Sequence, residues 1–415
     1  MRIALLTYRG NMFCGGQGIY AAYLANEWKR AGHDVHVIAG PPLPLLDDGI
    51  PLHVIPNENV FGVPHPDWAR REHPFRLLWP LNLWELGVSR IGVFPEMQSF
   101  GLRLLLRWRE LQRRQHFDVV FDNQCLSWGL LGIQAAGTPV VSVIHHPLHI
   151  DREADFAIDP SLKKKIKRTL YFPLLMQQIV APRLARIVTV SEASRTEIER
   201  YFGIPEKEVP VVYNGTDLEV FHPVQGQPIE ADLLFVGRTE DRKKGIGTLL
   251  EAMTHLPEQV TLKIVDGRIP ENGLVPRLIR QHRLESRVIL HKQMLSVPEL
   301  VAQYSTARAA VVPSFFEGFG FPASEAMACG LPVITTTNTG GADVIRDGRG
   351  GFIIPIRDVA ALKEKILYFY ENPEACRSMG EAARERVQTG FTWADYGDKI
   401  VAHYQRVLAG SVGSE

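Results

Sequence analysis

The stretch from 311 to 330 constrains the fold most, because it encodes a strand, a glycine-bearing loop and a helix in close succession. The apolar run before Pro313 predicts a strand that ends at this proline, which has no backbone N–H for a sheet ladder. Pro322 suits the first turn of a helix, and Gly330 suits its end. The start of such a helix offers free N–H groups and a positive dipole end, so we expect the loop to bind phosphate.

Two carboxylates flank this predicted phosphate site. Glu317 lies in the loop, and Glu325 lies in the first turns of the helix. A carboxylate accepts hydrogen bonds from neighbouring hydroxyl groups, such as those of a ribose or a hexose. This combination is typical of a nucleotide-sugar site. The alternative is an ordinary strand–helix unit with two solvated acids, and the two residues alone leave both interpretations open.

The run Glu-Gly-Phe-Gly-Phe-Pro-Ala-Ser-Glu-Ala-Met-Ala-Cys-Gly-Leu-Pro-Val-Ile begins at Glu317 and resembles the signature of retaining glycosyltransferase family 4, the glycosyl transferases group 1. That family has the GT-B fold. The resemblance implies that Glu317 faces the donor sugar and that Glu325 holds the ribose. It also places the residues after Glu317 at the donor: Gly318, Phe319, Gly320 and Phe321.

Length and composition bound the class of protein. A chain of 415 residues exceeds one ordinary core, which favours two domains. Basic and acidic residues number 46 each, so net charge gives no argument for nucleic-acid binding. The four cysteines have no metal-binding or Cys-x-x-Cys spacing, which indicates a reduced, cytoplasmic chain. No apolar run is long enough to span a membrane, and no cleavable leader is recognised.

The N-terminal region predicts a parallel βαβ unit: a strand over 2–8, a glycine loop over 9–18, a helix over 19–31 and a strand over 34–39. A dinucleotide-binding oxidoreductase would need Gly-x-Gly-x-x-Gly in this loop and an acid after the second strand. The loop glycines have a different spacing and no acid follows the strand, so this function is disfavoured. By the resemblance, Gly15 and Gly16 match a glycine pair that opens the loop toward the donor phosphate and the acceptor. A flexible turn is the alternative.

A histidine follows another predicted strand. The apolar run over 138–144 ends at His145 and His146. A polar residue at the carboxyl end of a parallel strand points toward a ligand crevice. The resemblance implies that His145 lies near the donor sugar, with His146 as the alternative. A purely structural histidine is the other interpretation.

Two basic segments lie in the N-terminal half, in a predicted helix over 96–116 and in the run 163–168. Amphipathic basic segments can lie on anionic membranes, but a charge run is more often a solvated face, and the solvated face is favoured here. The irregular stretch 57–95 carries Trp68, Phe75, Trp79 and Trp84. These aromatic residues suggest stacking on an acceptor sugar, contact with a lipid, or a peripheral hydrophobic patch.

The C-terminal half begins with a predicted strand over 231–236, followed by Gly237-Arg238, Lys244-Gly245 and a helix over 246–253. These pairs resemble family elements that hold the donor diphosphate. Arg238 can bind two phosphate oxygens at once, and Lys244 supplies a compact charge. Lys243 is a competing candidate, and an exposed charged turn is the alternative.

The sequence therefore predicts an α/β protein of the GT-B class, with two Rossmann-like, doubly wound parallel-sheet domains facing a central cleft. The expected parts are an acceptor domain over 1–215, a linker over 216–230, a nucleotide-sugar domain over 231–391 and a helix over 392–410 that crosses back to the first domain.

The resemblance implies transfer of a sugar, with retention, from a UDP- or GDP-sugar to a sugar, lipid-linked or small-molecule acceptor in glycan, glycolipid or cell-envelope polysaccharide synthesis. The expected catalytic residues are His145, Arg238, Lys244 and Glu317. We expect no cofactor and no metal, because these cations can do the electrostatic work of a metal and no convincing Asp-x-Asp element is present. A GT-B phosphorylase, a nucleotide-sugar epimerase and a non-catalytic binding module remain as alternatives, as does peripheral membrane contact.

Overall fold

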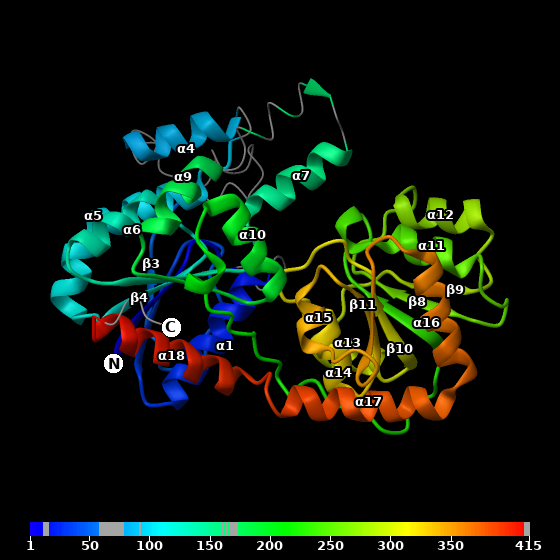
Figure 1. Ribbon diagram of the computed structural model, residues 1–415. Helices are drawn as coiled ribbons and strands as arrows, with labels where there is room; N and C mark the ends of the chain where they lie inside the picture. The colour runs from blue at the N-terminus through cyan, green and yellow to red at the C-terminus, as the bar shows by residue number, and fades with distance from the viewer. Residues whose placement is uncertain are drawn as a thin grey trace. The chain divides into compact units, whose positions relative to one another are not determined.

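The computed structural model describes residues 1–10, 16–57, 79–90, 93–158, 161, 162, 165, 169 and 173–410. These residues form two compact α/β units (Figure 1). The first contains the described residues of Met1–Val190, Ser194–Val212 and Gly397–Glu415. The second contains Ser191–Ala193 and Tyr213–Tyr396.

The first unit is built on a parallel sheet of six strands in the order β3-β2-β1-β4-β5-β6. The strands are β1 Arg2–Thr7, β2 Asp34–Ala39, β3 Leu52–Val54, β4 Val119–Asn123, β5 Val140–Ile144 and β6 Arg186–Thr189. The helices are α1 Gln17–Arg30, α4 Pro80–Arg90, α5 Glu96–Gln115, α6 Trp128–Ala135, α7 Leu148–Ile158, α9 Leu174–Val180, and most of α10 Glu192–Phe202 and of α18 Trp393–Leu408.

The central strands of this sheet are buried along almost their whole length, as expected for a parallel sheet covered on both faces. Helices α5 and α6 approach each other closely because glycines face each other. A Cβ atom added to Gly129 would lie 1.9 Å from the carbonyl oxygen of Gly101. Trp28 connects α1 with α18. Its ring packs against Tyr404 of α18, and its Nε1 donates a hydrogen bond to the Gly397 carbonyl.

The second unit has a parallel sheet of six strands in the order β12-β11-β10-β7-β8-β9. The strands are β7 Ala231–Val236, β8 Leu262–Val265, β9 Val288–His291, β10 Ala307–Val312, β11 Val333–Thr336 and β12 Gly351–Ile354. The helices are α11 Ile246–Met253, α12 Leu274–His282, α13 Val297–Tyr304, α14 Phe321–Ala328, α15 Gly340–Val344, α16 Val359–Glu371 and α17 Pro373–Gln388.

Both sheets share one topology. Counted along each unit, the strand order is third, second, first, fourth, fifth, sixth. The chain direction through the sheet therefore reverses between β1 and β4 in the first unit, and between β7 and β10 in the second. In such sheets the ligand crevice lies at the carboxyl ends of the strands beside this switch point. The predicted pair of doubly wound parallel sheets is confirmed, and its topology locates one candidate crevice in each unit.

The unit boundaries differ slightly from the predicted domains. The division falls between Val212 and Tyr213, so residues 216–230, predicted as a linker, group with the second unit. The part of α18 from Gly397 onward groups with the first unit. The assignment of an acceptor to the first domain and a donor to the second stays a prediction.

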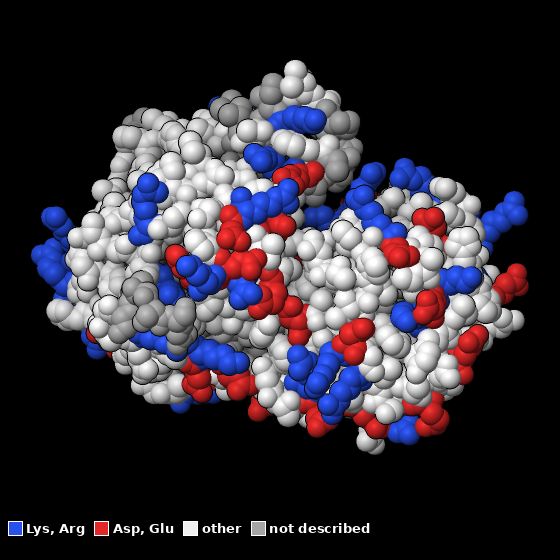
Figure 2. Space-filling model, in the orientation of Figure 1, with Lys and Arg blue, Asp and Glu red and all other residues white. Residues whose placement is uncertain are grey.

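The basic helix α5 divides its arginines between two environments. Arg103 is buried and ion-paired with Glu85 of α4, whereas Arg107, Arg109, Arg113 and Arg114 are exposed. Figure 2 shows basic and acidic side chains interspersed over the visible face. Membrane contact through this helix stays a prediction, since the exposed arginines fit a solvated face as well. Within the described ranges, no helix is both long and apolar enough to cross a bilayer.

Several predicted elements fall outside the described residues. These are Gly15, the basic residues Lys163, Lys164, Lys167 and Arg168, and the aromatic residues Trp68 and Phe75. Of the other two aromatic residues in that stretch, Trp79 is exposed and Trp84 is half-buried.

Candidate functional site

The predicted strand, loop and helix are present in the second unit. β10 ends at Val312 and α14 begins at Phe321, with Pro322 in its first turn. Gly320 precedes the helix with a φ of 85°, a left-handed conformation that favours glycine. The loop is also packed tightly from outside, since a Cβ atom on Gly340 would lie 2.4 Å from the Gly318 carbonyl oxygen. The loop is therefore held in one shape beside the helix start.

A second loop lies beside it at the switch point. It leads from the end of β7 through Gly237 and Arg238 to a short turn at Arg242–Lys244 and then to α11. The backbone N–H of Phe315, in the β10 loop, donates a 2.7 Å hydrogen bond to the Lys243 carbonyl. The two loops therefore form one connected surface at the carboxyl ends of β7 and β10.

Gly245 makes this contact between the loops sterically possible. Its φ is 71°, and a Cβ atom there would lie 1.9 Å from the Pro313 carbonyl oxygen. We therefore expect Gly245→Ala to destabilise the protein by about 2 kcal/mol or more, because the left-handed conformation alone costs a residue with a Cβ about 1–2 kcal/mol. A loss of that size lowers the melting temperature by roughly 4–8 °C in a domain of this size.

Gly247→Ala is the matched control for this prediction. Gly247 lies on α11, where an added Cβ would meet only the Leu278 Cδ1 at 3.9 Å, an ordinary contact. We expect its melting temperature to equal or slightly exceed that of the wild type, since alanine favours a helix over glycine. Equal melting temperatures for the two variants would show that the close approach at Gly245 is relaxed in solution.

The switch point brings Lys244 and Glu317 together. The Lys244 Nζ lies 3.0 Å from the Glu317 Oε1, and the Ser314 hydroxyl donates a 2.5 Å hydrogen bond to the same oxygen. The Glu317 side chain is only 8% exposed and that of Lys244 is 23% exposed. A pair this buried is fixed in position, because removal of either partner leaves the other charge poorly solvated.

The second glutamate of the motif, Glu325, lies on α14 and is half-buried. The hydroxyl of the fully buried Tyr304 donates a 2.8 Å hydrogen bond to its Oε2. Burial raises the pKa of Glu325 to about 7; the Tyr304 hydrogen bond opposes this rise, and the charge of Glu317 adds to it. Near neutral pH, Glu325 is therefore present in both its protonated and its charged form.

The Arg238 side chain is less constrained by its neighbours than that of Lys244. Its side chain is 67% exposed and lies 3.3 Å from Asp241, an exposed contact of little energetic weight. The loop beneath it is fixed, since the N–H and the hydroxyl of Thr239 both donate to Asp266 after β8. Arg238 thus projects from a rigid loop, and its guanidinium can turn toward an incoming anion.

His145 lies in the first unit, directly after β5, as predicted. Its Nε2 lies 2.8 Å from the Asn123 Oδ1, and the Asn123 amide nitrogen donates a hydrogen bond to the Gln17 carbonyl. That second bond fixes which end of the amide faces His145. The Nε2 must therefore carry the proton, and the Nδ1 is left as the acceptor.

The charge of His145 is also determined by its surroundings. Burial, followed by the neighbouring His146, lowers the pKa of His145 to about 3, so the ring is neutral throughout the physiological range. Its ring meets Tyr20 edge to face, and its backbone N–H donates to the Gln124 side chain. His146 faces a different group, Asp151 of α7, at 3.0 Å. Gly16 precedes α1 with a φ of 72°.

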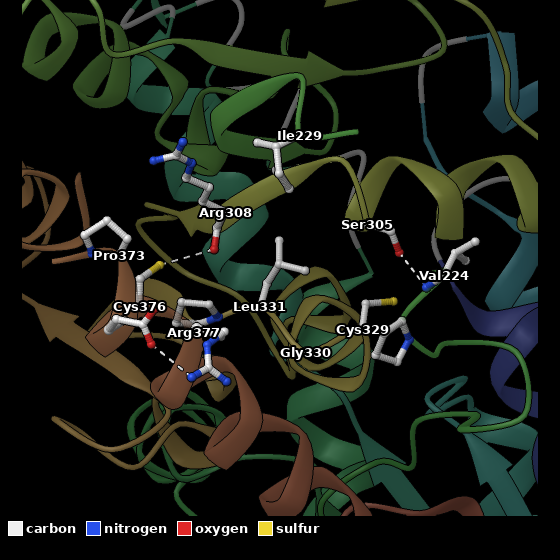
Figure 3. A pocket seen from close by; sticks show the side chains of 14 residues that line it. Val224, Ile229, Ser305, Arg308, Cys329, Gly330, Leu331, Pro373, Cys376 and Arg377 are labelled. Atoms are coloured by element: carbon white, nitrogen blue, oxygen red, sulfur yellow. Dashed lines mark hydrogen bonds and ion pairs between the residues drawn. The ribbon is translucent and has the colours of Figure 1, made fainter. Parts of the chain in front are cut away.

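A cavity without any of the site residues above lies elsewhere in the second unit (Figure 3). It has a volume of about 390 Å³ and is lined from the amino ends of β10 and β11, by Arg308 and Leu331, and from the start of α17, by Cys376. It thus lies at the amino ends of the strands, opposite the two loops described above. None of the predicted site residues lines it.

The structure adds site residues that the sequence alone did not single out. Ser314 and Tyr304 bind the two glutamates, and Asn123 and Gln124 hold His145. The sequence could have indicated Ser314, because it lies three residues before Glu317 in the same loop. It gave no such indication for the other three, because each contacts a residue in a different element.

Comparisons with known proteins identify the family of this chain. The family model "Glycosyl transferases group 1" matches residues 222–386, and the model "Glycosyltransferase Family 4" matches residues 14–220. The chain is 34% identical to the MMP alpha-(1->4)-mannosyltransferase of Mycolicibacterium hassiacum, over 99% of both chains. It is 26% identical to the glycogen synthase of Mycobacterium tuberculosis, over 95% of this chain and 92% of the relative.

Solved structures show the same architecture. The sucrose-phosphate synthase from Thermosynechococcus elongatus superposes with a TM-score of 0.71 at 22% identity, over 99% of this chain and 100% of that one. The Anabaena protein Alr3699/HepE, in complex with UDP-glucose, superposes with a TM-score of 0.68 at 18% identity, over 98% and 99% of the two chains.

Proposed function

Because the chain belongs to the glycosyl transferases group 1 and has the two-domain α/β GT-B fold, it is a glycosyltransferase, and we propose that it uses a nucleotide-diphosphate sugar and retains the anomeric configuration. The observation that carries this proposal is the fixed contact of Lys244 with Glu317 at the switch point of the second sheet, beside the start of α14. A cation, a carboxylate and free helix N–H groups at one crevice match a phosphate joined to a hydroxylated sugar.

In this proposal the second unit holds the donor. Lys244, Arg238 and the first N–H groups of α14 bind the diphosphate, Glu317 accepts hydrogen bonds from the sugar hydroxyls, and Glu325 accepts them from the ribose. The loop glycines Gly237, Gly318 and Gly320 let the donor approach the backbone, and Phe319 and Phe321 line the same loop. The edge-to-face contact of these two rings, 5.3 Å between centroids, supports a rigid wall there.

The reaction breaks the bond between the anomeric carbon and the diphosphate oxygen and forms one to the acceptor oxygen. Negative charge grows on the leaving diphosphate, and the fixed cation Lys244 stabilises it most in the transition state. The acceptor proton passes to the leaving phosphate on the same face of the sugar. Glu317 supports this route over a double displacement, because its Oε1 already accepts from both Lys244 and Ser314 and is a weakened nucleophile.

The first unit is assigned to the acceptor. The neutral His145 offers its Nδ1 as a hydrogen-bond acceptor at the end of β5, and Gly16 opens the backbone before α1. We propose that His145 takes a hydrogen bond from a sugar hydroxyl rather than acting as a cation. The identity with a mannosyltransferase over the whole chain favours a hexose as the transferred sugar.

A donor screen tests this function. We expect GDP-mannose, UDP-glucose or a related hexose donor to raise the melting temperature, because a ligand at 100 times its dissociation constant adds about 2.7 kcal/mol of stability. NMR of the product should show an anomeric configuration equal to that of the donor. A chelator should leave the rate unchanged, since Arg238 and Lys244 supply the positive charge.

Each part of this test can contradict the proposal separately. Absence of a shift with every nucleotide sugar would exclude the donor site. An inverted product would exclude retention while leaving the donor site intact. Loss of activity with the chelator, restored by a divalent cation, would overturn the metal-independent mechanism alone.

A further inference from the structure

Tyr304 is the last residue of α13, and none of its surface is exposed. Its ring meets that of Phe221 edge to face, and its hydroxyl donates to the Glu325 Oε2 at 2.8 Å. Burial and the adjacent Glu325 charge raise the pKa of Tyr304 well above its ordinary value, so the hydroxyl keeps its proton and remains a donor. Tyr304 therefore contacts one oxygen of Glu325 from the protein interior.

The surroundings make this hydrogen bond strong. Ser305, which follows Tyr304, and Cys329, one turn after Glu325, both line the cavity at the amino edge of the sheet (Figure 3). Burial, with the Glu325 charge, raises the pKa of the Cys329 thiol to about 12, so it remains uncharged. Because Tyr304 is fully buried, its hydrogen bond to the carboxylate is shielded from water and is stronger than it would be in water.

The two oxygens of Glu325 thus have different roles. Oε2 is held by Tyr304, and within the described residues the carboxylate accepts no other side-chain hydrogen bond. Oε1 is left to accept from a ligand. We propose that Tyr304 is a positioning residue that holds Glu325 so that its second oxygen meets the ribose hydroxyls of the donor. This inference rests on the proposed nucleotide-sugar function.

The charged and titratable groups facing Glu325 are few among the described residues. They are Tyr304 from α13, Glu317 from the β10 loop, and Cys329 on the same helix, with Arg384 of α17 beyond Cys329. Of the groups that influence Glu325, only the Tyr304 hydroxyl favours its charged form. Loss of this hydroxyl should therefore make Glu325 harder to ionise, and the pH at which donor affinity develops should rise.

The variant Tyr304→Phe tests the proposal, because it removes the hydroxyl and keeps the ring. At pH 7 we expect a donor affinity about tenfold weaker, the effect of one hydrogen bond to a charged group. The turnover number at saturating donor should change little, so the loss should appear in KM. The matched control is Tyr370→Phe, on α16 of the same unit, since among the described residues Tyr370 forms no hydrogen bond to the site.

A comparison of ribose with 2′-deoxyribose nucleotides separates positioning from a merely structural role. Wild type and Tyr370→Phe should prefer the ribose form, whereas Tyr304→Phe should lose most of this preference. The ratio of the two affinities does not depend on how much of the variant is folded. In a Glu325→Gln background, Tyr304→Phe should have little further effect, since the two residues act as one unit.

The possible outcomes are distinct. If the wild type binds no nucleotide sugar, the proposed function fails. If the wild type binds one and Tyr304→Phe keeps its ribose preference, the positioning role fails alone. If Tyr304→Phe loses affinity equally for the ribose and the 2′-deoxyribose nucleotide, the positioning role is also overturned, because a structural defect does not distinguish the two nucleotides.

Discussion

Replacing Lys244 by alanine is expected to lower turnover by about 10²–10³, the loss typical of one preorganised electrostatic group in an active site. Its ammonium is held 3.0 Å from Glu317 and lies at the switch point where the leaving diphosphate is proposed to bind. The substitution removes the transition-state cation and also leaves the buried Glu317 without its ion-pair partner. Steady-state kinetics at saturating donor would measure this loss directly.

Lys243→Ala is the control for Lys244→Ala. The Lys243 contact that connects the two loops is made by its backbone carbonyl with the Phe315 N–H, and alanine keeps that carbonyl. We therefore expect a mild effect on turnover. If the two variants behave alike, the position of the diphosphate site is wrong. Arg238→Ala should also reduce turnover, since its exposed guanidinium can fork onto the phosphate oxygens.

Glu325→Gln should weaken the binding of the nucleotide sugar and of the free nucleotide by about 1.5–3 kcal/mol, the cost of losing a charged hydrogen-bond partner. The wild type should also show a pH dependence. Because the pKa of Glu325 is raised to about 7 and the ribose hydroxyls favour its charged form, affinity should fall as pH falls through 7. From this pKa, binding at pH 6 should be about tenfold weaker than at pH 8.

This pH series is best measured by titration calorimetry with the nucleotide sugar, because the terminal phosphate of a free nucleotide titrates in the same range. Glu325→Gln should remove the pH dependence together with the affinity. Glu317→Gln is the companion control, since it should spare the free nucleotide and impair the sugar donor. Unchanged nucleotide affinity in Glu325→Gln would remove the ribose role.

Local sequence rules were sufficient for the elements that form these sites. The proline that ends β10, the proline in the first turn of α14 and the helix α11 at 246–253 follow from backbone chemistry that acts within a few residues. The same rules located Glu317 in the loop after β10, Glu325 on the following helix and Lys244 in the loop after β7. Their proposed roles came from the family resemblance rather than from these rules.

Local sequence rules could not predict the contacts that hold the site residues in position. Tyr304 lies 21 residues before Glu325, and Asn123 lies 22 residues before His145. Each pair meets only after separate elements pack together, and no periodic pattern encodes that meeting. Arg103 shows the same limit, since five arginines on one basic helix gave no signal that this one is buried against Glu85.

The placement of α18 has a consequence for how the chain matures during synthesis. The second unit occupies one nearly continuous stretch, from Tyr213 to Tyr396, whereas the first takes its final helix from residues that follow that stretch. Until Gly397 and Tyr404 emerge from the ribosome, the indole of Trp28 can pack on Phe121 but lacks the Tyr404 ring and its hydrogen-bond acceptor. The unit translated first is therefore completed only after the second unit has been made, and Trp28 gains its hydrogen bond to Gly397 only then.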